Sequence, residues 1–417
     1  MKSKNELKLL LNAIQTFIDK LSLKYMKIQL SPISVVLLAL FFTLQVQAQE
    51  NLPFGQNREI ISPEIHADNS VTFRLTAPTA NNVSVTGDFL APGEEANMIK
   101  DADGVWSYTT HPLPSELYTY AFNVDGLQMN DPNNVYYRRD VASTLNILLV
   151  GNGQADLYKV NSVPHGTVTK RWYQSPGNNM NRRITIYTPP GYEESDNSYP
   201  VLYLLHGMGG DEEAWMTLGR ASQIVDNLIA QGNAEPMIIV MPNGNVAQEA
   251  APGESSLGFY KPQFRLPHTM DGKYEETFHE IIRFVDSQYR TIPEKAGRAI
   301  AGLSMGGFHT LHISRYYPNT FDYMGLFSAA IMPDEKIKSK VYDSIEETLV
   351  TQKNNGYTLY WIAIGKEDFL YQANIDFRKK LDAMDFPYIY RESEGGHTWR
   401  NWRIYLSEFL PMLFKTR

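Results

Sequence analysis

The stretch "IAGLSMGGFHT", residues 300–310, decides the fold because it sets one serine between two glycines in the pattern Gly-x-Ser-x-Gly. An apolar run, residues 298–301, precedes the pattern, and residues with helical spacing follow it. Glycines at 302 and 306 permit close backbone packing around a sharp strand-to-helix turn. This context predicts that Ser304 is held in a strained turn with its hydroxyl exposed to a reaction. The alternative is an ordinary tight turn between a strand and a helix.

The sequence around this turn alternates short apolar runs with amphipathic segments. Runs of this kind are typical of buried parallel strands, and the segments between them have the 3.6-residue spacing of helices. Strands are predicted at residues 201–205, 238–241, 299–301, 324–327 and 359–364, and helices at 221–230, 277–289, 307–316 and 374–384. Residues 160–417 are therefore predicted to form an α/β domain, with a mostly parallel sheet covered by helices on both faces.

A different pattern occupies residues 51–155. Short runs with period-two alternation, such as "SVTFRLTAP" and "LYTYAFNVDG", are separated by Pro, Gly, Asn and Asp. This pattern predicts an antiparallel, all-β sandwich of the immunoglobulin-like type. Its aromatic side chains could stack on a sugar, although alternating aromatic residues more often form the sandwich core. The residues in question are Trp106, Tyr108, Tyr118 and Tyr120.

The N-terminal region has the features of a secretory signal. Basic residues near Met26 precede an apolar run at 35–44 and the small-residue site "VQA", which ends at Ala48. We expect residues 26–48 to be a signal peptide cleaved after Ala48, because the run is short for a membrane span. The protein is then exported, periplasmic or extracellular, with no membrane anchor after cleavage. Residues 1–25 are interpreted as an upstream extension with Met26 as the true start.

Composition excludes several classes of function. The 417 residues carry a formal net charge of -8, which disfavours nucleic acid as a partner. The chain has no cysteine, so disulfides, thiolate nucleophiles and cysteine-ligated zinc are excluded. No cofactor or metal signature was found, and covalent chemistry is left to residues such as Ser304.

A serine hydroxyl needs a base and an orienting acid to act as a nucleophile. In this type of fold the chain order is serine, acid, histidine. His397, in "SEGGHTWRNW", is the histidine that follows the last strand-like run, and Asp368 follows the buried run 359–364, with Glu367 as its nearest rival. Ser304, Asp368 and His397 are therefore the predicted catalytic residues.

The remaining site residues are predicted from loops. The N–H groups of Met305 and of Met208, in "LLHGMGGDEEAW", are predicted to form an oxyanion hole, with Gly209 as an alternative to Met208. Residues 244–272 and 331–356 are expected to be long loops bordering the site. Phe259, Tyr260 and Phe264 in the first loop could hold an aromatic acyl group, although they could simply anchor the loop, and Trp399 beside the histidine is a similar candidate. Phe259, Tyr260 and Trp399 are the predicted substrate contacts.

Five collinear motifs resemble the esterase D family, in particular carbohydrate esterase family 1, which contains bacterial feruloyl and acetyl-xylan esterases. They are "YPVLYLLHGMGGDEEAW", "MPNGN", "RAIAGLSMGG", "GKEDFLY" and "GGHTWRNW". The resemblance implies an α/β-hydrolase fold, with Ser304 as nucleophile, His397 as general base and Asp368 as its orienting acid. The stretch "GVWSYTTHPLPSELYTYAFNVDG" is similar, more loosely, to carbohydrate-binding family 48.

The resemblance implies a secreted serine esterase that removes feruloyl or acetyl groups from esterified xylan or xylo-oligosaccharide through an acyl-enzyme. Two alternatives remain open at the level of the sequence. One is an enterobactin-type siderophore esterase, which the acidic balance disfavours. The other is an exported glycan-binding protein without activity, which the complete set of Ser304, Asp368 and His397 disfavours.

Overall fold

The computed structural model describes residues 12–13, 15–16 and 60–415. The predicted signal peptide, nearly all of the upstream extension and the start of the predicted sandwich lie outside the described residues. In the part of the chain that is described, no helix is both long and apolar enough to cross a membrane. Export therefore stays a prediction from the sequence.

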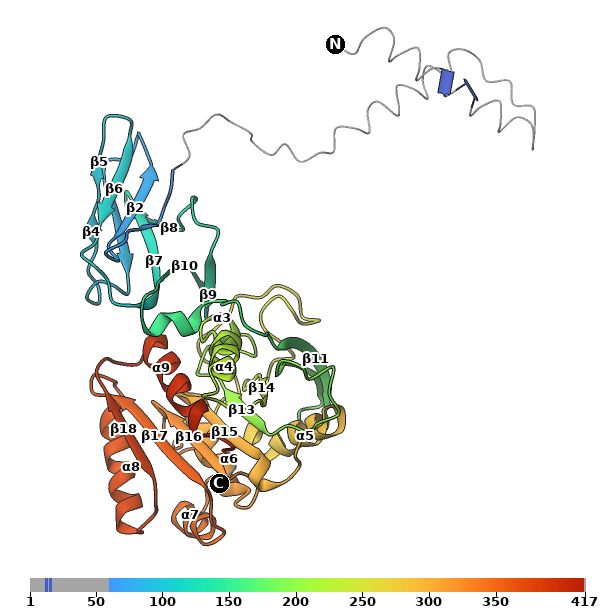
Figure 1. The fold of residues 1–417 in the computed structure, drawn as a ribbon. Helices are drawn as coiled ribbons and strands as arrows, with labels where there is room; N and C mark the ends of the chain where they lie inside the picture. The colour runs from blue at the N-terminus through green and yellow to red at the C-terminus, as the bar shows by residue number, and fades with distance from the viewer. Residues whose placement is uncertain (1–11, 14, 17–59, 416–417) are drawn as a thin grey trace. The chain divides into compact units, whose positions relative to one another are not determined.

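Antiparallel strands form the N-terminal part of the chain described from residue 60 onward, between Glu64 and Val150 (Figure 1). One sheet has the order β1-β2-β6-β5, and the other has the order β4-β3-β7-β10-β9 with β8 paired to β7. The strands are β1 (Glu64–Ile65), β2 (Val71–Thr76), β3 (Val83–Gly87), β4 (Ala96–Asn97), β5 (Ile99–Lys100), β6 (Val105–Thr109), β7 (Glu116–Val124), β8 (Leu127–Met129), β9 (Tyr137–Asp140) and β10 (Ser143–Val150). The predicted all-β sandwich is confirmed.

The four aromatic residues considered for sugar stacking belong to the core cluster of the sandwich. Trp106, Tyr118 and Tyr120 are buried, and Tyr108 packs against the same cluster as Phe73 and Phe122. Period-two alternation places one side of each strand inward, and these rings occupy that side. They therefore do not offer a surface for stacking on sugar, and the alternative interpretation as core residues is correct.

The chain after the sandwich contains an eight-stranded sheet with the order β11-β12-β14-β13-β15-β16-β17-β18. The pairs β11·β12 and β12·β14 are antiparallel, and the pairs from β14·β13 to β17·β18 are parallel. The strands are β11 (Thr167–Ser175), β12 (Met180–Thr188), β13 (Val201–Leu205), β14 (Ile238–Pro242), β15 (Arg298–Leu303), β16 (Tyr323–Phe327), β17 (Leu359–Gly365) and β18 (Ile389–Ser393). The predicted mostly parallel sheet is confirmed.

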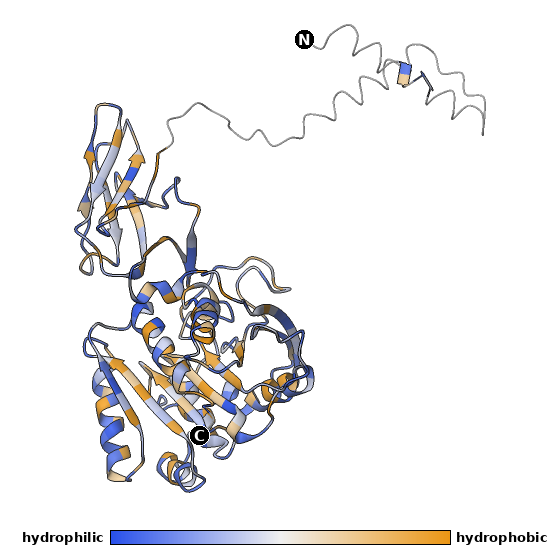
Figure 2. Ribbon diagram, viewed as in Figure 1, coloured by the Kyte–Doolittle hydropathy of each residue, from blue (hydrophilic) through white to orange (hydrophobic). Residues whose placement is uncertain are grey.

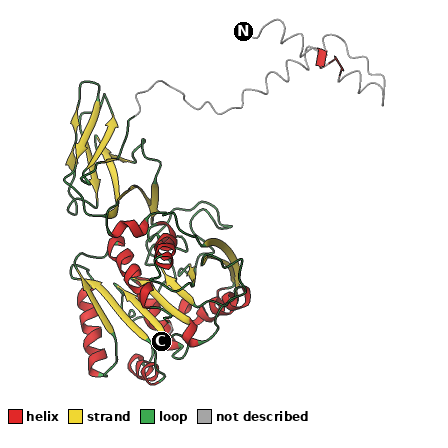
Figure 3. Ribbon diagram, in the orientation of Figure 1, coloured by secondary structure: helices red, strands yellow, loops and turns green. Residues whose placement is uncertain are grey.

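Helices cover both faces of this sheet (Figure 3). The helices are α3 (Ala214–Thr217), α4 (Ala221–Ala230), α5 (Lys273–Gln288), α6 (Met305–Tyr316), α7 (Ile345–Asn354), α8 (Tyr371–Ala383) and α9 (Trp399–Phe409). Leu202 and Leu204 of β13 pack in a core with α3, α4 and α9, whereas Val201 and Tyr203 pack in a second core with α5, α6 and α8. Because neighbouring strand residues point to opposite faces, these strands must be apolar throughout, and Figure 2 shows hydrophobic residues along them.

Two parts of this fold differ from the expectation. Residues 331–356 were expected to be a loop but contain α7, in which only Leu349 and Gln352 are buried. Because so few of its side chains are buried, this helix has only a weak apolar period, and the sequence pattern does not indicate it. Strands β11, β12 and β18 were not predicted, and β11 and β18 are the two edge strands of the sheet. The residues of β11 are mostly exposed and polar.

Residues Ile60–Arg417 form one compact unit, and a buried ion pair joins the sandwich strands to the helices of the α/β sheet. Arg403 of α9 donates from Nη2 to Glu116 Oε1 at 2.9 Å, and both side chains are almost fully buried. The guanidinium also donates to the carbonyl oxygens of Leu117 and Leu218, each at 2.9 Å. Every contact of this cation is therefore made away from bulk water.

Replacing Glu116 by Gln is expected to lower the free energy of unfolding by about 3–5 kcal/mol, because it leaves the Arg403 charge buried without its partner. Urea denaturation measures this loss. Glu394→Gln, which breaks the exposed pair with Lys366, is the matched control and should have a far smaller effect on the free energy of unfolding, because solvent screens the pair. Equal effects of the two substitutions would contradict the prediction.

Candidate active site

Ser304 lies between β15 and α6 in a backbone conformation that few serines adopt, with φ 54° and ψ -113°. The flanking residues must be glycines, because a side chain at either position would overlap the neighbouring backbone. A Cβ at Gly302 would lie 2.5 Å from the backbone of Gly306, and one at Gly306 would lie 2.4 Å from Leu205 O. A left-handed conformation of this kind costs about 1–3 kcal/mol and persists where the surrounding structure enforces it. The strand–turn–helix context expected around Ser304 is present.

Asp368 and His397 are joined by hydrogen bonding, although 29 residues separate them. His397 Nδ1 lies 2.9 Å from Asp368 Oδ2 and 3.0 Å from Oδ1. The Asp368 side chain is fully buried, and its Oδ1 also accepts from the N–H of Leu370 at 2.9 Å. Because Nδ1 faces the carboxylate, Nε2 is left on the other side of the ring. Glu367, the rival acid, is exposed.

The rings around His397 further restrict its orientation. Its imidazole packs edge-on against Trp402, with centroids 4.9 Å apart, and lies 4.6 Å from the ring of Phe369. Asp368 and Phe369 follow β17, whereas His397 and Trp402 come from the loop after β18 and from α9. The carboxyl ends of neighbouring parallel strands thus bring these residues to one edge of the sheet, where functional groups of open α/β sheets gather.

A cavity of about 440 Å³ contains both Ser304 and His397 on its lining. Met208 and Met305, the predicted oxyanion donors, line it as well. Met305 begins α6, where the first N–H groups of a helix have no partner within the helix. The loop that carries Met208 approaches the serine closely, since a Cβ at Gly207 would lie 3.3 Å from Ser304 Cβ. The structure therefore brings the predicted nucleophile, base and donor loops to one cavity.

The predicted substrate contacts are only partly at this cavity. Trp399 lines it and packs edge-on against Trp215 and Trp402. Phe259 does not line it and is 98% exposed. Tyr260 does not line it either, and its hydroxyl accepts a hydrogen bond from Gln248 at 2.9 Å.

Phe264, the third aromatic candidate of this loop, does line the cavity, together with residues that were not predicted. Phe264 and Met270 of the same loop line the cavity, as does Phe369. The sequence indicated the correct loop but not which of its three aromatic candidates lines the cavity, because a segment without helix or strand has no period that says which side chain points inward.

His206 was not predicted from the sequence, although its hydrogen bonds hold the loop that carries Met208. The imidazole is buried, with Nδ1 2.7 Å from Gly207 O, and its Nε2 accepts the N–H of Gly244 at 2.7 Å. This pattern fixes a neutral ring with the proton on Nδ1. Burial lowers the pKa of His206 to about 4. The sequence feature that could have identified His206 is its position directly before the glycine-rich loop.

This burial predicts that stability falls with acid. Between about pH 6.5 and pH 4 the unfolded chain binds a proton at His206 that the folded chain does not, so the free energy of unfolding decreases as the pH drops through this window. The contribution is complete above the unfolded pKa, and its loss by pH 4 amounts to about 3 kcal/mol. Urea denaturation at pH 7, 6, 5 and 4 should show a shallower pH dependence for His206→Asn than for the wild type. Parallel curves would contradict the assignment.

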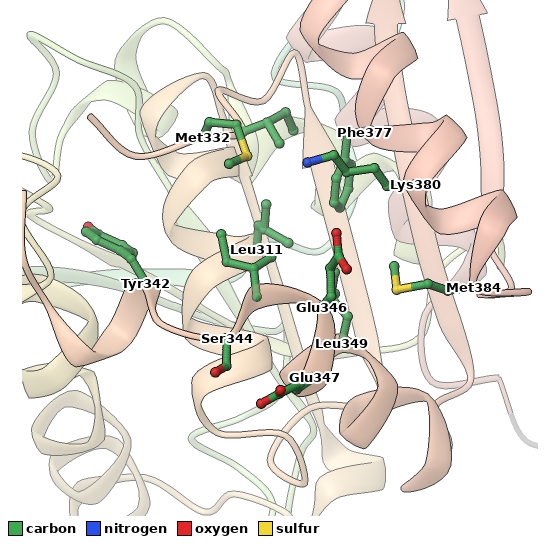
Figure 4. A pocket seen from close by; sticks show the side chains of 12 residues that line it. Leu311, Met332, Tyr342, Ser344, Glu346, Glu347, Leu349, Phe377, Lys380 and Met384 are labelled. Carbon is green, nitrogen blue, oxygen red and sulfur yellow. The ribbon is translucent and has the colours of Figure 1, made fainter. Parts of the chain in front are cut away.

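A second cavity, of about 410 Å³, lies among α6, α7 and α8 (Figure 4). Leu311, Leu349 and Phe377 supply apolar walls, and Glu346 and Lys380 also line it. None of Ser304, Asp368 and His397 lines this cavity. The candidate active site is therefore the cavity at the strand ends.

Family comparisons cover both halves of the chain. The Esterase family model matches residues 175–413, and carbohydrate-binding module 48, the isoamylase N-terminal domain, matches residues 53–137. These matches agree with the resemblances seen in the sequence and with the fold class. They cover the elements that carry Ser304, Asp368 and His397.

Individual relatives and a solved structure are similar to half or more of this chain. The chain is 32% identical over 285 residues to the endo-1,4-beta-xylanase/feruloyl esterase of Xylanibacter ruminicola, covering 66% of this chain and 37% of that protein. It is 28% identical over 248 residues to an acetyl esterase of Caldicellulosiruptor saccharolyticus, covering 52% of this chain and 83% of the relative. The crystal structure of the enterobactin esterase of Shigella flexneri shares the fold, with a TM-score of 0.57, 16% identity, and coverage of 82% of this chain and 92% of that chain. The chain thus spans little more than a third of the xylanase/feruloyl esterase.

Proposed function

Because this chain belongs to the Esterase family, we propose that it is a serine carboxylesterase that releases feruloyl or acetyl groups from esterified xylan. The chief support is the strained turn at Ser304, which faces the same cavity as the His397 ring held by Asp368. The relatives that carry the names feruloyl esterase and acetyl esterase favour these two acyl groups. Export, as expected from residues 26–48, would bring the enzyme to its polysaccharide.

The proposed reaction assigns one role to each group. Ser304 Oγ attacks the ester carbonyl carbon while His397 Nε2 takes its proton. The oxyanion that forms is stabilised by the N–H groups of Met208 and Met305. His397 then protonates the departing sugar oxygen, which leaves the acyl group on Ser304, and water repeats the sequence to release the acid. Asp368 holds the imidazole in the required tautomer and stabilises its charged form.

The cavity suits a neutral acyl group. Phe264, Phe369 and Trp399 supply aromatic surface against which a feruloyl ring can pack. Among the cavity-lining residues of the described chain, Arg139 is the only lysine or arginine, and its guanidinium is paired with Asp211 at 2.5 Å. A catecholate siderophore carries negative charge, so this lining favours the cell-wall esters over the siderophore alternative.

Paired assays of the purified protein on methyl ferulate and on acetylated xylan test this proposal, with Ser304→Ala as control. Release of ferulate or acetate by the wild type alone is the expected result and identifies the acyl group. Turnover of a ferric catecholate trilactone with neither product would replace the proposed substrate by a siderophore. No turnover of any ester would support the inactive glycan-binding protein.

A further inference from the structure

Three stretches of chain that line the catalytic cavity come from different parts of the α/β domain. Met270 lies just before α5, Ser304 and Met305 lie at the start of α6, and Ala330 follows β16. Met270 and Ser304 have φ of 60° and 54°, conformations that few residues other than glycine adopt. Such conformations persist where the surrounding structure holds them. A group that joins the three stretches therefore also fixes the geometry of the site.

One carboxylate behind the cavity belongs to the first of these stretches and is bonded to the other two. Glu275 follows Met270 in the chain, in the first turn of α5. Its Oε1 accepts from Nδ1 of His309 on α6 at 2.8 Å. The same oxygen accepts from the hydroxyl of Tyr342 at 3.4 Å. Because Tyr342 belongs to the segment that runs from Ala330 to α7, the carboxylate joins all three stretches.

These bonds are made away from solvent. The side chains of Glu275 and His309 are 0% and 1% exposed, and Tyr342 is also buried. Glu275 Oε2 has no hydrogen-bond partner among the described residues, so Oε1 makes both bonds. A buried carboxylate is costly unless donors satisfy it. The position of this carboxylate is therefore set by the two donors, and their positions are set by it.

The partners of Glu275 are in turn connected to the nucleophile. Ser304 O accepts from the N–H of Phe308 at 3.0 Å and from the N–H of Ala330 at 3.1 Å. The rings of Phe308 and Tyr342 pack with their centroids 5.5 Å apart, and Met270 and Ala330 pack against the same small hydrophobic cluster. A displacement of α6 relative to α5 would therefore move Ser304 relative to the other walls of the cavity.

We infer that Glu275 is a positioning residue for the esterase reaction, because its bonds to His309 and Tyr342 set the nucleophile turn against two other walls of the cavity. Glu275 itself does not line the cavity, so it acts through the groups that do. A displacement of about 1 Å in a reacting group can lower a rate about hundredfold. The inference rests on the proposed function, since the effect of Glu275 is measured in ester hydrolysis.

The test is the kinetics of two Glu275 variants on methyl ferulate, or on another ester that the wild type cleaves. Glu275→Ala should lower kcat about tenfold to hundredfold and change KM less than about threefold, because misplaced Ser304 and Met305 impair the chemical step more than binding. Glu275→Gln should keep kcat within about fivefold of the wild type, since its amide oxygen can accept both hydrogen bonds.

Glu280→Ala is the matched control on the same helix. Glu280 is also buried, and its carboxylate accepts from Ser175 Oγ at 2.6 Å and from the N–H of Gly177 at 2.8 Å. None of these three residues lines the catalytic cavity. Each alanine variant leaves buried donors without a partner, so thermal melts should show a similar loss of stability for both. The kcat of Glu280→Ala should nevertheless stay within about twofold of the wild type.

The outcomes separate a positioning role from a purely structural one. A loss of kcat confined to Glu275→Ala, with recovery in Glu275→Gln, supports the inference. Similar kcat values for the two alanine variants, or a glutamine variant as slow as Glu275→Ala, overturn it and leave the esterase proposal intact. If Glu275→Ala does not fold, His309→Leu removes the same bond from the other side and should lower kcat about tenfold. An unchanged kcat in that variant also overturns the inference. If the wild type hydrolyses no ester, the proposed function fails and the inference fails with it.

Discussion

Ser304→Ala is expected to lower kcat by about four to six orders of magnitude on any ester that the wild type cleaves, because the variant lacks the hydroxyl that attacks the ester carbonyl. Alanine keeps the same backbone and removes only the hydroxyl, so the fold should be retained. Initial rates under saturating substrate measure kcat, and a thermal melt of the same preparation measures stability.

Ser328→Ala is the matched control for this substitution. Ser328 is also a serine with positive φ at a strand end, and its buried hydroxyl has no hydrogen-bond partner within the described chain. Its replacement should leave kcat close to the wild-type value. Wild-type turnover by Ser304→Ala would show that Ser304 is not the nucleophile.

Asp368→Asn is expected to lower kcat by about four orders of magnitude, since an amide no longer enforces the proton on His397 Nδ1 or stabilises the imidazolium. The distances of 2.9 and 3.0 Å between His397 Nδ1 and the Asp368 oxygens leave no room for an intervening group. The same initial-rate assay at pH 7 measures the loss. Because the side chains are similar in shape, the melting temperature should change far less than the rate.

Glu367→Gln resolves the choice that the sequence left open between neighbouring acids. Glu367 is exposed and Asp368 is buried against the histidine. We expect Glu367→Gln to keep kcat within about twofold of the wild type. If it abolished activity while Asp368→Asn did not, the two assignments would have to be exchanged.

The strands, helices and turn whose positions were predicted correctly are each specified by a short stretch of the chain. The strand at Val201–Leu205 and the helix at Ala221–Ala230 have the bounds expected from their apolar periods. The five-residue pattern around Ser304 predicts its own turn, because only glycines fit at 302 and 306. The roles of the catalytic residues remain predictions, which the substitutions above test.

The residues that sequence reasoning misplaced or missed depend on partners far along the chain. Phe264 lines the cavity and Phe259 points to solvent, although both lie in one loop without a period. Arg139 reaches Asp211, which is 72 residues away in the sequence. No local pattern distinguishes such residues, because their positions are set by the packing of the sandwich against the α/β sheet.

The amino-acid sequence by itself therefore determined the two fold classes, the strained turn at Ser304 and the order of the acid and the histidine, because these follow from hydrophobic period, glycine spacing and chain order. Only the tertiary structure decided which acid faces His397, which aromatic residues line the cavity and that the sandwich forms one of its walls. The physical reason is that burial and contact between distant segments are properties of the packed chain. The sequence gives the identity of each side chain, whereas the contacts of that side chain depend on how the folded chain packs.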